Sequence, residues 1–192
     1  TSNKQLNFLQ HVMSILAEGG VGAVVMPDNV LFEAGAGEKA RRRLLDAFDF
    51  HTLLRLPTGV FYKQGVKANV LFFNKRPAAE TPWTSDLWIY DFRTNESFTL
   101  KERPLKREHL DDFVAVARLT DRAKRMETER FRKFAYADLV KRDKLNLDIF
   151  WLKDSSLEDP DSLPPPDEIA AEIVESLEAA LQRFRSVANK LA

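Results

Sequence analysis

Two segments that each combine apolar residues with a turn constrain the fold more than any other feature of this chain. The first is GAVVMPDNVLF at residues 22–32, and the second is LLRLPTGVFYKQGVKANVLFF at residues 53–73. Short apolar runs bounded by Pro and Gly are typical of buried strands. We interpret them as neighbouring parts of a doubly wound α/β sheet, which binds ligands at the edge where its strands deliver their loops.

Three strands are predicted in this region, at 22–27, 50–56 and 68–73. The first is apolar on both faces, as expected of a central parallel strand. Only about a dozen residues without helical periodicity separate the second and third strands, and a parallel crossover needs more chain than that. We therefore expect the second and third strands to be antiparallel.

Two helices are predicted around these strands. The first begins at residue 2 or 3, carries a wide apolar stripe that indicates burial, and ends at Gly19–Gly20. The second covers 38–48, with Arg41–Arg43 expected toward solvent. Gly35 and Gly37 precede it and form either a flexible loop or a phosphate-binding nest.

The remainder of the chain divides into further segments. Residues 86–93 and 97–102 read as a hairpin, and a helical stretch follows. The stretch after Trp151 is rich in Pro, Asp and Ser and favours a linker. We expect four parts: a sheet domain with the added hairpin, a helical segment, a linker and a C-terminal helix, at 1–105, 106–152, 153–166 and 167–192.

The C-terminal helix carries a heptad seam. Its apolar residues recur at alternating spacings of three and four: Ala170, Ile173, Leu177, Ala180, Phe184, Val187 and Leu191. Such a seam packs either against another chain or back onto its own domain. Because a linker precedes the helix, we expect a subunit interface formed by Ile173, Leu177, Phe184, Val187 and Leu191.

Composition limits the chemistry that this chain can perform. The 192 residues include no cysteine, which excludes disulfides, thiolate metal sites and a cysteine nucleophile, and the three histidines are scattered, so no metal site is expected. No apolar run is long enough to span a bilayer and no signal peptide is evident, so we expect a cytoplasmic protein with no membrane partner. The chain begins at Thr1 without an initiator methionine, which indicates a piece of a longer protein.

Charge is unevenly distributed although the net charge is zero. Residues 101–144 hold 14 Lys and Arg against 9 Asp and Glu, whereas residues 145–192 hold 4 against 10. The basic stretch either faces an acidic partner such as nucleic acid or forms an ordinary solvated helical surface.

Several segments together resemble the modification subunit of type I restriction-modification systems, an N6-adenine DNA methyltransferase. They are the first helix, PDNVLFEAGAGEKARRRLL, LRLPTGVFYKQGVKANVLFFNK, KRDKLNLDIFWLKD and the acidic C-terminal helix, in the family's order. The resemblance implies the trailing half of a Rossmann-like, S-adenosylmethionine-dependent methyltransferase sheet, mixed in direction, whose last strand is reversed. It also implies DNA, a specificity subunit and a restriction subunit as partners.

Two motifs of that family have no match in this chain. They are the glycine-rich cofactor loop and the catalytic Asn-Pro-Pro-aromatic tetrapeptide. The resemblance therefore implies no catalytic residue in this chain, and an isolated chain that neither binds the cofactor properly nor transfers a methyl group.

The resemblance does imply residues on one side of a pocket for the target base. A DNA adenine methyltransferase extrudes its base and holds it by stacking, and the matching position here is Phe61, with Tyr62 in reserve. The alternative is that Phe61 plugs the core under its turn. Lys63 and Lys67 are candidate DNA contacts or simply solvated, and Asn29 either approaches the same cleft or caps its own turn.

Alternative functions remain open at this level. One is a non-enzymatic protein-interaction module built on a methyltransferase-like scaffold, and another is an RNA or protein methyltransferase. We also expect the first strand to leave an unpaired edge, so that the chain associates with itself or aggregates.

Overall fold

The computed structural model describes residues 1–62 and 65–153, together with seven residues of the C-terminal region: Ala170, Val174, Leu177, Glu178, Leu181, Phe184 and Arg185. The chain forms two compact units, Thr1–Asp154 and Ser155–Ala192. The first unit contains every strand among these residues.

Helix α1 (Lys4–Ile15) begins at a side-chain cap, as the sequence predicted. The Asn3 Oδ1 accepts hydrogen bonds from the backbone N–H groups of Gln5 and Leu6, at 2.9 and 3.1 Å. Such a cap satisfies N–H groups that have no partner within the helix. The buried stripe is narrower than expected, because Phe8 and Ile15 are exposed.

A five-stranded mixed sheet follows, in the order β1-β3-β2-β4-β5. The strands are β1 (Val21–Pro27), β2 (Phe48–Leu56), β3 (Ala68–Lys75), β4 (Asp86–Asp91) and β5 (Phe131–Ala135). Strand β3 runs antiparallel to both neighbours, β1 and β2. The predicted reversal of the third strand is therefore confirmed, and the mixed α/β fold with it.

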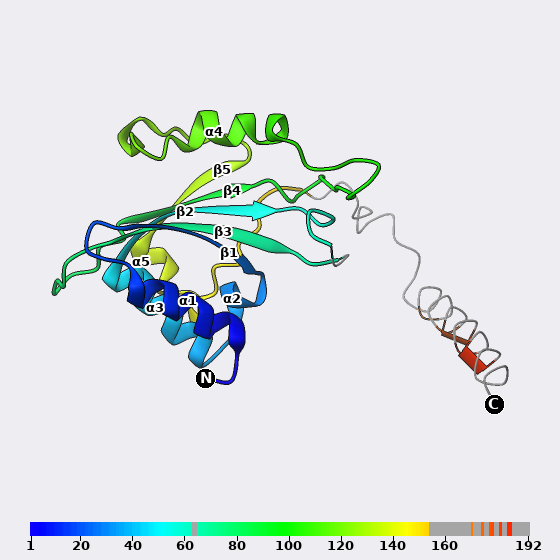
Figure 1. Cartoon of the computed structure of the whole chain (residues 1–192), viewed down its shortest axis with the longest axis horizontal. Helices are drawn as coiled ribbons and strands as arrows, with labels where there is room; N and C mark the ends of the chain where they lie inside the picture. Colours follow the sequence, from blue (N-terminus) through cyan, green and yellow to red (C-terminus); the bar gives the residue numbers. More distant parts are fainter. Residues whose placement is uncertain are drawn as a thin grey trace. The chain divides into compact units, whose positions relative to one another are not determined.

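Helices cover the two faces of the sheet unequally (Figure 1). On one face lie α1, α2 (Asn29–Phe32), α3 (Ala36–Ala47) and α5 (Tyr136–Leu139), and on the other lies α4 (Asp111–Ala117). Short 3-10 turns occupy Arg107–Leu110, Arg122–Lys124 and Asp143–Leu145. The larger core cluster includes residues of α1, α3 and β2, and the smaller includes residues of β2, β4 and α4.

The predicted hairpin is wrong. Strand β4 forms as expected, but it pairs in parallel with β2 and antiparallel with β5, and residues 97–102 form no strand. Ring stacking favours this distant partner, since the Phe131 ring of β5 lies 4.8 Å from the Trp88 ring of β4. The chain after β4 is instead held in a turn by the Asp91 carboxylate.

Strand β1 is not the central, doubly covered strand that its composition indicated. It lies at the edge of the sheet, and its side chains alternate between exposed and buried. Val21 and Val25 are 70% and 49% exposed. The predicted free edge is therefore present in the described part of the chain.

Arg41 is a further correction, because it is buried rather than solvated. Its guanidinium donates to the backbone carbonyls of Val30, Glu33, Lys144 and Leu145, at 2.6 to 2.9 Å. Burial lowers the pKa of Arg41 to about 10. This one side chain joins the ends of α2 and of the 143–145 turn to α3.

The described residues of the second unit are helical and exposed. They include an apolar series at spacings of three, four and three: Val174, Leu177, Leu181 and Phe184. Ile173, Val187 and Leu191 lie outside the described residues. Among the described residues, no helix combines the length and apolar character that a bilayer span requires.

Candidate functional site

The carboxyl ends of three strands lie at the same end of the sheet. Strands β1 and β2 are both antiparallel to β3, and β4 is parallel to β2, so β1, β2 and β4 point the same way. In sheets of this kind, ligands bind outside the carboxyl ends of the strands. The predicted site residues follow β1 and β2, so we look for the candidate site at this carboxyl end of the sheet.

A pocket of about 820 Å³ opens beyond the end of β2. One wall consists of Thr58, Gly59, Phe61 and Tyr62, and the facing wall runs from Phe98 to Glu102. The volume is in the range of pockets that accept small molecules. The lining combines aromatic rings with hydroxyl and charged groups.

The two walls of the pocket are joined through their backbones. The Phe98 N–H donates to the Thr58 carbonyl at 3.1 Å, and Thr58 forms a parallel bridge with Ser97. Gly59 has a φ of +81°, and a Cβ there would lie 1.5 Å from the Phe98 carbonyl oxygen. Only glycine permits this approach, so residues 58–59 and 97–98 form one continuous floor.

Phe61 and Tyr62 both line the pocket but differ in exposure. Phe61 is half-buried and packs against the smaller core cluster, whereas Tyr62 is 94% exposed. One side of the Phe61 ring is thus supported by the core while the residue also lines the pocket. A ring held in this way is better ordered for stacking than one surrounded by solvent.

Two of the other predicted contact residues, Asn29 and Lys67, lie outside the pocket lining. The Asn29 Nδ2 donates to Glu33 Oε2 at 3.1 Å, and Glu33 is the residue that follows the same helix. Lys67 is exposed, immediately before β3. Lys63 lies outside the described residues.

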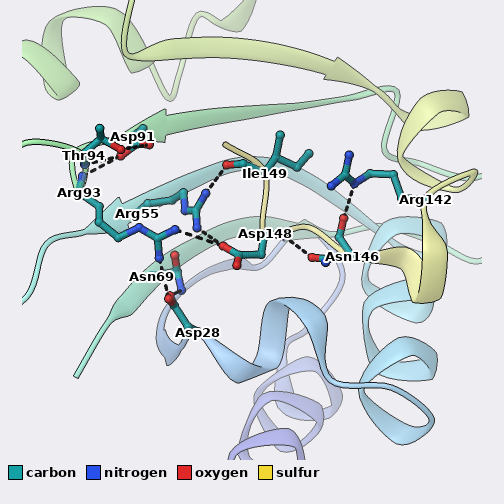
Figure 2. Close-up of polar contacts among 10 residues, drawn as sticks. All are labelled: Asp28, Arg55, Asn69, Asp91, Arg93, Thr94, Arg142, Asn146, Asp148 and Ile149. Carbon is teal, nitrogen blue, oxygen red and sulfur yellow. Dashed lines mark hydrogen bonds and ion pairs between the residues drawn. The ribbon is translucent and has the colours of Figure 1, made fainter. Parts of the chain in front are cut away.

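A cluster of paired charges, which the sequence did not predict, lies at the same carboxyl end of the sheet (Figure 2). The Asp148 carboxylate accepts hydrogen bonds from the guanidiniums of Arg55, on β2, and Arg93, which follows β4. The Arg55 guanidinium also donates to the Ile149 carbonyl. Arg55 is fully buried and Arg93 is 9% exposed, so both cations depend on these partners.

The cluster continues to the end of β1. The Arg93 Nη1 donates to Asp28 Oδ2 at 2.6 Å, and the Asn69 Nδ2 donates to Asp28 Oδ1 at 2.7 Å. Two buried arginines are therefore matched by two carboxylates. Together these side chains join β1, β2, β3 and the turn after β4 to residues 145–150.

An aromatic ring completes the cluster. The guanidinium carbons of Arg55 and Arg93 lie 4.5 and 4.8 Å from the centroid of the Phe150 ring. Cation–π contacts of this kind stabilise by about 0.5–2 kcal/mol each. Phe150 is nevertheless 61% exposed, so its ring covers the buried charges from the solvent side.

Sequence reasoning missed this cluster, although its members carry a local signal. Arg55 interrupts the apolar run LLRL, Asp148 interrupts NLDIF, and Arg93 follows a strand of aromatics. A charged residue inside an apolar run indicates a buried, paired charge. Nothing local identifies the partner, however, because Arg93 and Asp148 are 55 residues apart.

A second charged cluster lies at the opposite end of β2. Asp49 accepts hydrogen bonds from Arg76 and Arg122, at 2.5 to 3.1 Å. Burial opposes the charged form of Asp49, but the two guanidiniums more than offset it and lower its pKa. Burial, with the Arg122 charge nearby, lowers the pKa of His51 to about 4, so His51 is neutral at physiological pH.

This second cluster is structural in its connections. The Arg125 guanidinium donates to the His51 carbonyl, to the Thr52 hydroxyl and to the Ala117 carbonyl. It thereby ties α4 to the sheet. Across the described ranges, no set of three His, Asp or Glu side chains is placed to hold a metal ion.

Comparisons with known proteins show which family this chain resembles. Residues 1–157 match the family model described as N-6 DNA methylase. The chain is 42% identical to the type I restriction enzyme EcoKI methylase subunit of Escherichia coli K12 and 40% identical to the StySJI methylase subunit of Salmonella typhimurium. Each match includes all of this chain and 42% of the relative's length.

Solved structures give the same relationship. The crystal structure of the EcoKI M protein matches with a TM-score of 0.74 at 39% identity, over all of this chain and 45% of that chain. A chain from a structural study of type I R-M system assembly matches with a TM-score of 0.66 at 25% identity, over all of this chain and 40% of that chain. This chain thus spans less than half the length of each protein that it resembles.

Proposed function

Because the chain belongs to the N-6 DNA methylase family, and within it to the modification subunits of type I restriction-modification systems, we propose that it provides the target-base side of an adenine-N6 DNA methyltransferase. In this role it forms the C-terminal part of an S-adenosylmethionine-dependent subunit. Its substrate is DNA, and its site of action is the bacterial cytoplasm.

The pocket beyond β2 is the observation that carries this proposal. An enzyme that methylates an exocyclic amine in a duplex must take the base out of the stack and hold it. Phe61 lines a pocket of about 820 Å³ and is supported from behind by the core. Stacking of the adenine on this ring stabilises the extruded state by about 1–3 kcal/mol.

Methyl transfer itself needs groups that we assign to no residue of this chain. The 192 residues contain neither the family's glycine-rich cofactor loop nor an Asn-Pro-Pro-aromatic tetrapeptide. The methyl donor, S-adenosylmethionine, supplies the electrophilic methyl group once bound to the complete subunit. We therefore expect the 192-residue chain alone to be inactive.

Subunit assembly is the second role that we propose for this chain. Leu177 and Phe184 are helical and exposed, in step with Val174 and Leu181. An exposed apolar stripe at this spacing is suited to packing against a helix of another chain. We assign it to the specificity subunit, within a complex that also includes DNA and the restriction subunit.

Substitution of Phe61 in the complete subunit tests the catalytic proposal. Phe61→Ala removes the ring, and we expect kcat/KM for DNA methylation to fall about 10- to 100-fold, the equivalent of the stacking energy. The extruded fraction, measured by the permanganate reactivity of the thymine left unpaired opposite the target, should fall as well, because the extruded base loses its support.

Phe61→Tyr serves as the matched variant, since it keeps the ring and should retain most of the activity. Phe8→Ala, on the exposed face of α1, controls for the loss of an aromatic side chain elsewhere. If Phe61→Ala leaves turnover and base extrusion unchanged, Phe61 has no part in the reaction. If the complete subunit transfers no methyl group to DNA at all, the alternative of a non-enzymatic interaction module is favoured.

A further inference from the structure

The wall of the pocket that carries Phe98 is positioned by the turn after β4. The Asp91 carboxylate accepts hydrogen bonds from the backbone N–H groups of Arg93 and Thr94, both at 2.9 Å, and from the Thr94 hydroxyl at 2.8 Å. The Arg130 Nη1 donates to the carbonyls of Asp91 and Thr94, each at 3.0 Å. The turn is thereby fixed at residues 91–94, and Thr94 precedes Phe98 of the pocket wall by four residues.

Residues 145–153, which we name the strap, hold the same turn from the other side. The Asp148 Oδ1 accepts from Arg93 Nη2 at 3.2 Å, and the Lys153 carbonyl accepts from Asn95 Nδ2 at 3.1 Å. The strap is itself anchored by Arg41, by the Leu31 carbonyl, which accepts from the Leu147 N–H at 2.9 Å, and by Arg55. It therefore connects a rigid part of the first unit to the turn.

We propose that Asp148 is a positioning residue for the target-base pocket, acting through Arg93 on the wall that carries Phe98. This inference rests on the proposed function and deepens it. Asp148 is not among the residues that line the pocket. Asp148 fixes the position of the turn that precedes residues 97–102.

The charge arrangement explains why a carboxylate is needed at this position. Arg55 and Arg93 share the Asp148 Oδ1, and Arg93 has Asp28 as its second anionic partner. Without the Asp148 charge, the nearly buried Arg93 guanidinium is drawn toward Asp28 alone, at the end of β1. Such a displacement carries the backbone of residues 93–98 with it, and small misplacements of a binding wall have large effects on rate.

The direct test compares Asp148→Asn with the unchanged protein, in the complete methylase subunit assembled with its specificity subunit. Asparagine keeps the size of the side chain but removes the charge. We expect kcat/KM for a duplex with one cognate site to fall about tenfold, the permanganate reactivity of the thymine opposite the target to fall, and Asp148→Glu to restore part of both. Asp143→Asn is the control, because that side chain is 88% exposed and lies outside the cluster.

A double-mutant comparison separates this inference from the proposed function. Phe61→Ala alone reports whether the pocket receives the base. Asp148→Asn in the Phe61→Ala background reports whether Asp148 acts through that pocket, and we expect its effect on base extrusion to disappear there. An equal effect in both backgrounds would show that Asp148 acts elsewhere and overturn the inference.

Asn95→Gly provides a second variant in case Asp148→Asn does not fold. Asn95 is exposed and has a φ of 63°, a conformation that glycine adopts freely, so the substitution loosens the strap from the turn with little strain. We expect a smaller fall in permanganate reactivity than for Asp148→Asn. A lowered unfolding temperature in either variant, with kcat, KM and permanganate reactivity unchanged, would make the cluster merely structural and refute a positioning role.

Discussion

Single buried side chains connect distant parts of this chain. Arg41 joins three segments through carbonyl oxygens, and Arg55 and Arg93 join four more through shared carboxylates. Hydrogen bonds of this kind, with a charged donor and buried acceptors, contribute about 1.5–3 kcal/mol each. The stability of the first unit should therefore depend strongly on a few arginines.

Arg41→Met tests this dependence. Methionine retains much of the apolar stem but removes every donor, which leaves buried carbonyls unpaired. We expect the free energy of unfolding in urea to fall by about 3 kcal/mol. Arg42→Met, at the next and exposed position, should change it by less than about 0.5 kcal/mol; equal effects would show that the Arg41 contacts contribute little.

His51 predicts a pH dependence of stability. Its pKa is about 4 in the folded chain and about 6.5 when unfolded. As pH falls from about 6.5 to about 4, the unfolded state takes up a proton that the folded state resists, so stability is lost over this interval. Thermal unfolding midpoints should decline across it, and His51→Asn should flatten the decline; an unaltered slope would assign the effect to other groups.

The elements show which parts of the fold local sequence specifies. A helix start at residue 2 or 3, the three strands between residues 21 and 75, and the reversal of β3 were predicted, because each depends on a local sequence pattern or on a loop too short for a crossover. The pairing of β4 was not, because its partner β5 begins 40 residues after β4 ends. A nearby candidate strand existed at 97–102, but β4 pairs with β2 and β5 instead, and the Asp91 carboxylate holds the chain after β4 in a turn.

The candidate site, too, was predicted only in part. Phe61 was identified by resemblance, and it lines the pocket. The facing wall, the strap and the paired charges were not identified, because partners such as Arg93 and Asp148 meet only after the sheet has formed. Burial of Arg41 was also missed, since a run of three arginines indicates solvent unless the packing of neighbouring helices is known.

The C-terminal helix supports a prediction about assembly. Leu177→Asp together with Phe184→Asp places two charges on the apolar stripe and should abolish copurification of the complete subunit with the specificity subunit. Glu178→Gln, at an exposed position beside Leu177, should have no effect. Persistence of the complex in the double variant would mean that the stripe does not form the interface.

At the scale of the whole molecule, the edge of the sheet should govern the behaviour of the 192-residue chain. Strand β1 lies at the end of the strand order, and Val21 and Val25 are exposed beside its free edge. Unpaired backbone groups next to apolar side chains promote pairing between copies. We expect light scattering to show dimers or larger species.

Val25→Lys should shift this population toward monomer, because a charge on an edge strand opposes pairing. Val114→Lys is the matched control: it introduces the same charge at an exposed valine of α4, away from the edge, and should have little effect. A monodisperse monomer of the unchanged chain would contradict the expected self-association.

The most direct measurement of the base-pocket function is photocrosslinking of the complete enzyme to a duplex with 5-iodouracil in place of the target adenine. Irradiation joins that base to the aromatic side chain on which it stacks. We predict that mass spectrometry will locate the crosslink at Phe61, and that Phe61→Ala will abolish it. A crosslink at an aromatic residue outside the pocket, unaffected by Phe61→Ala, would contradict the assignment of this pocket to the extruded base.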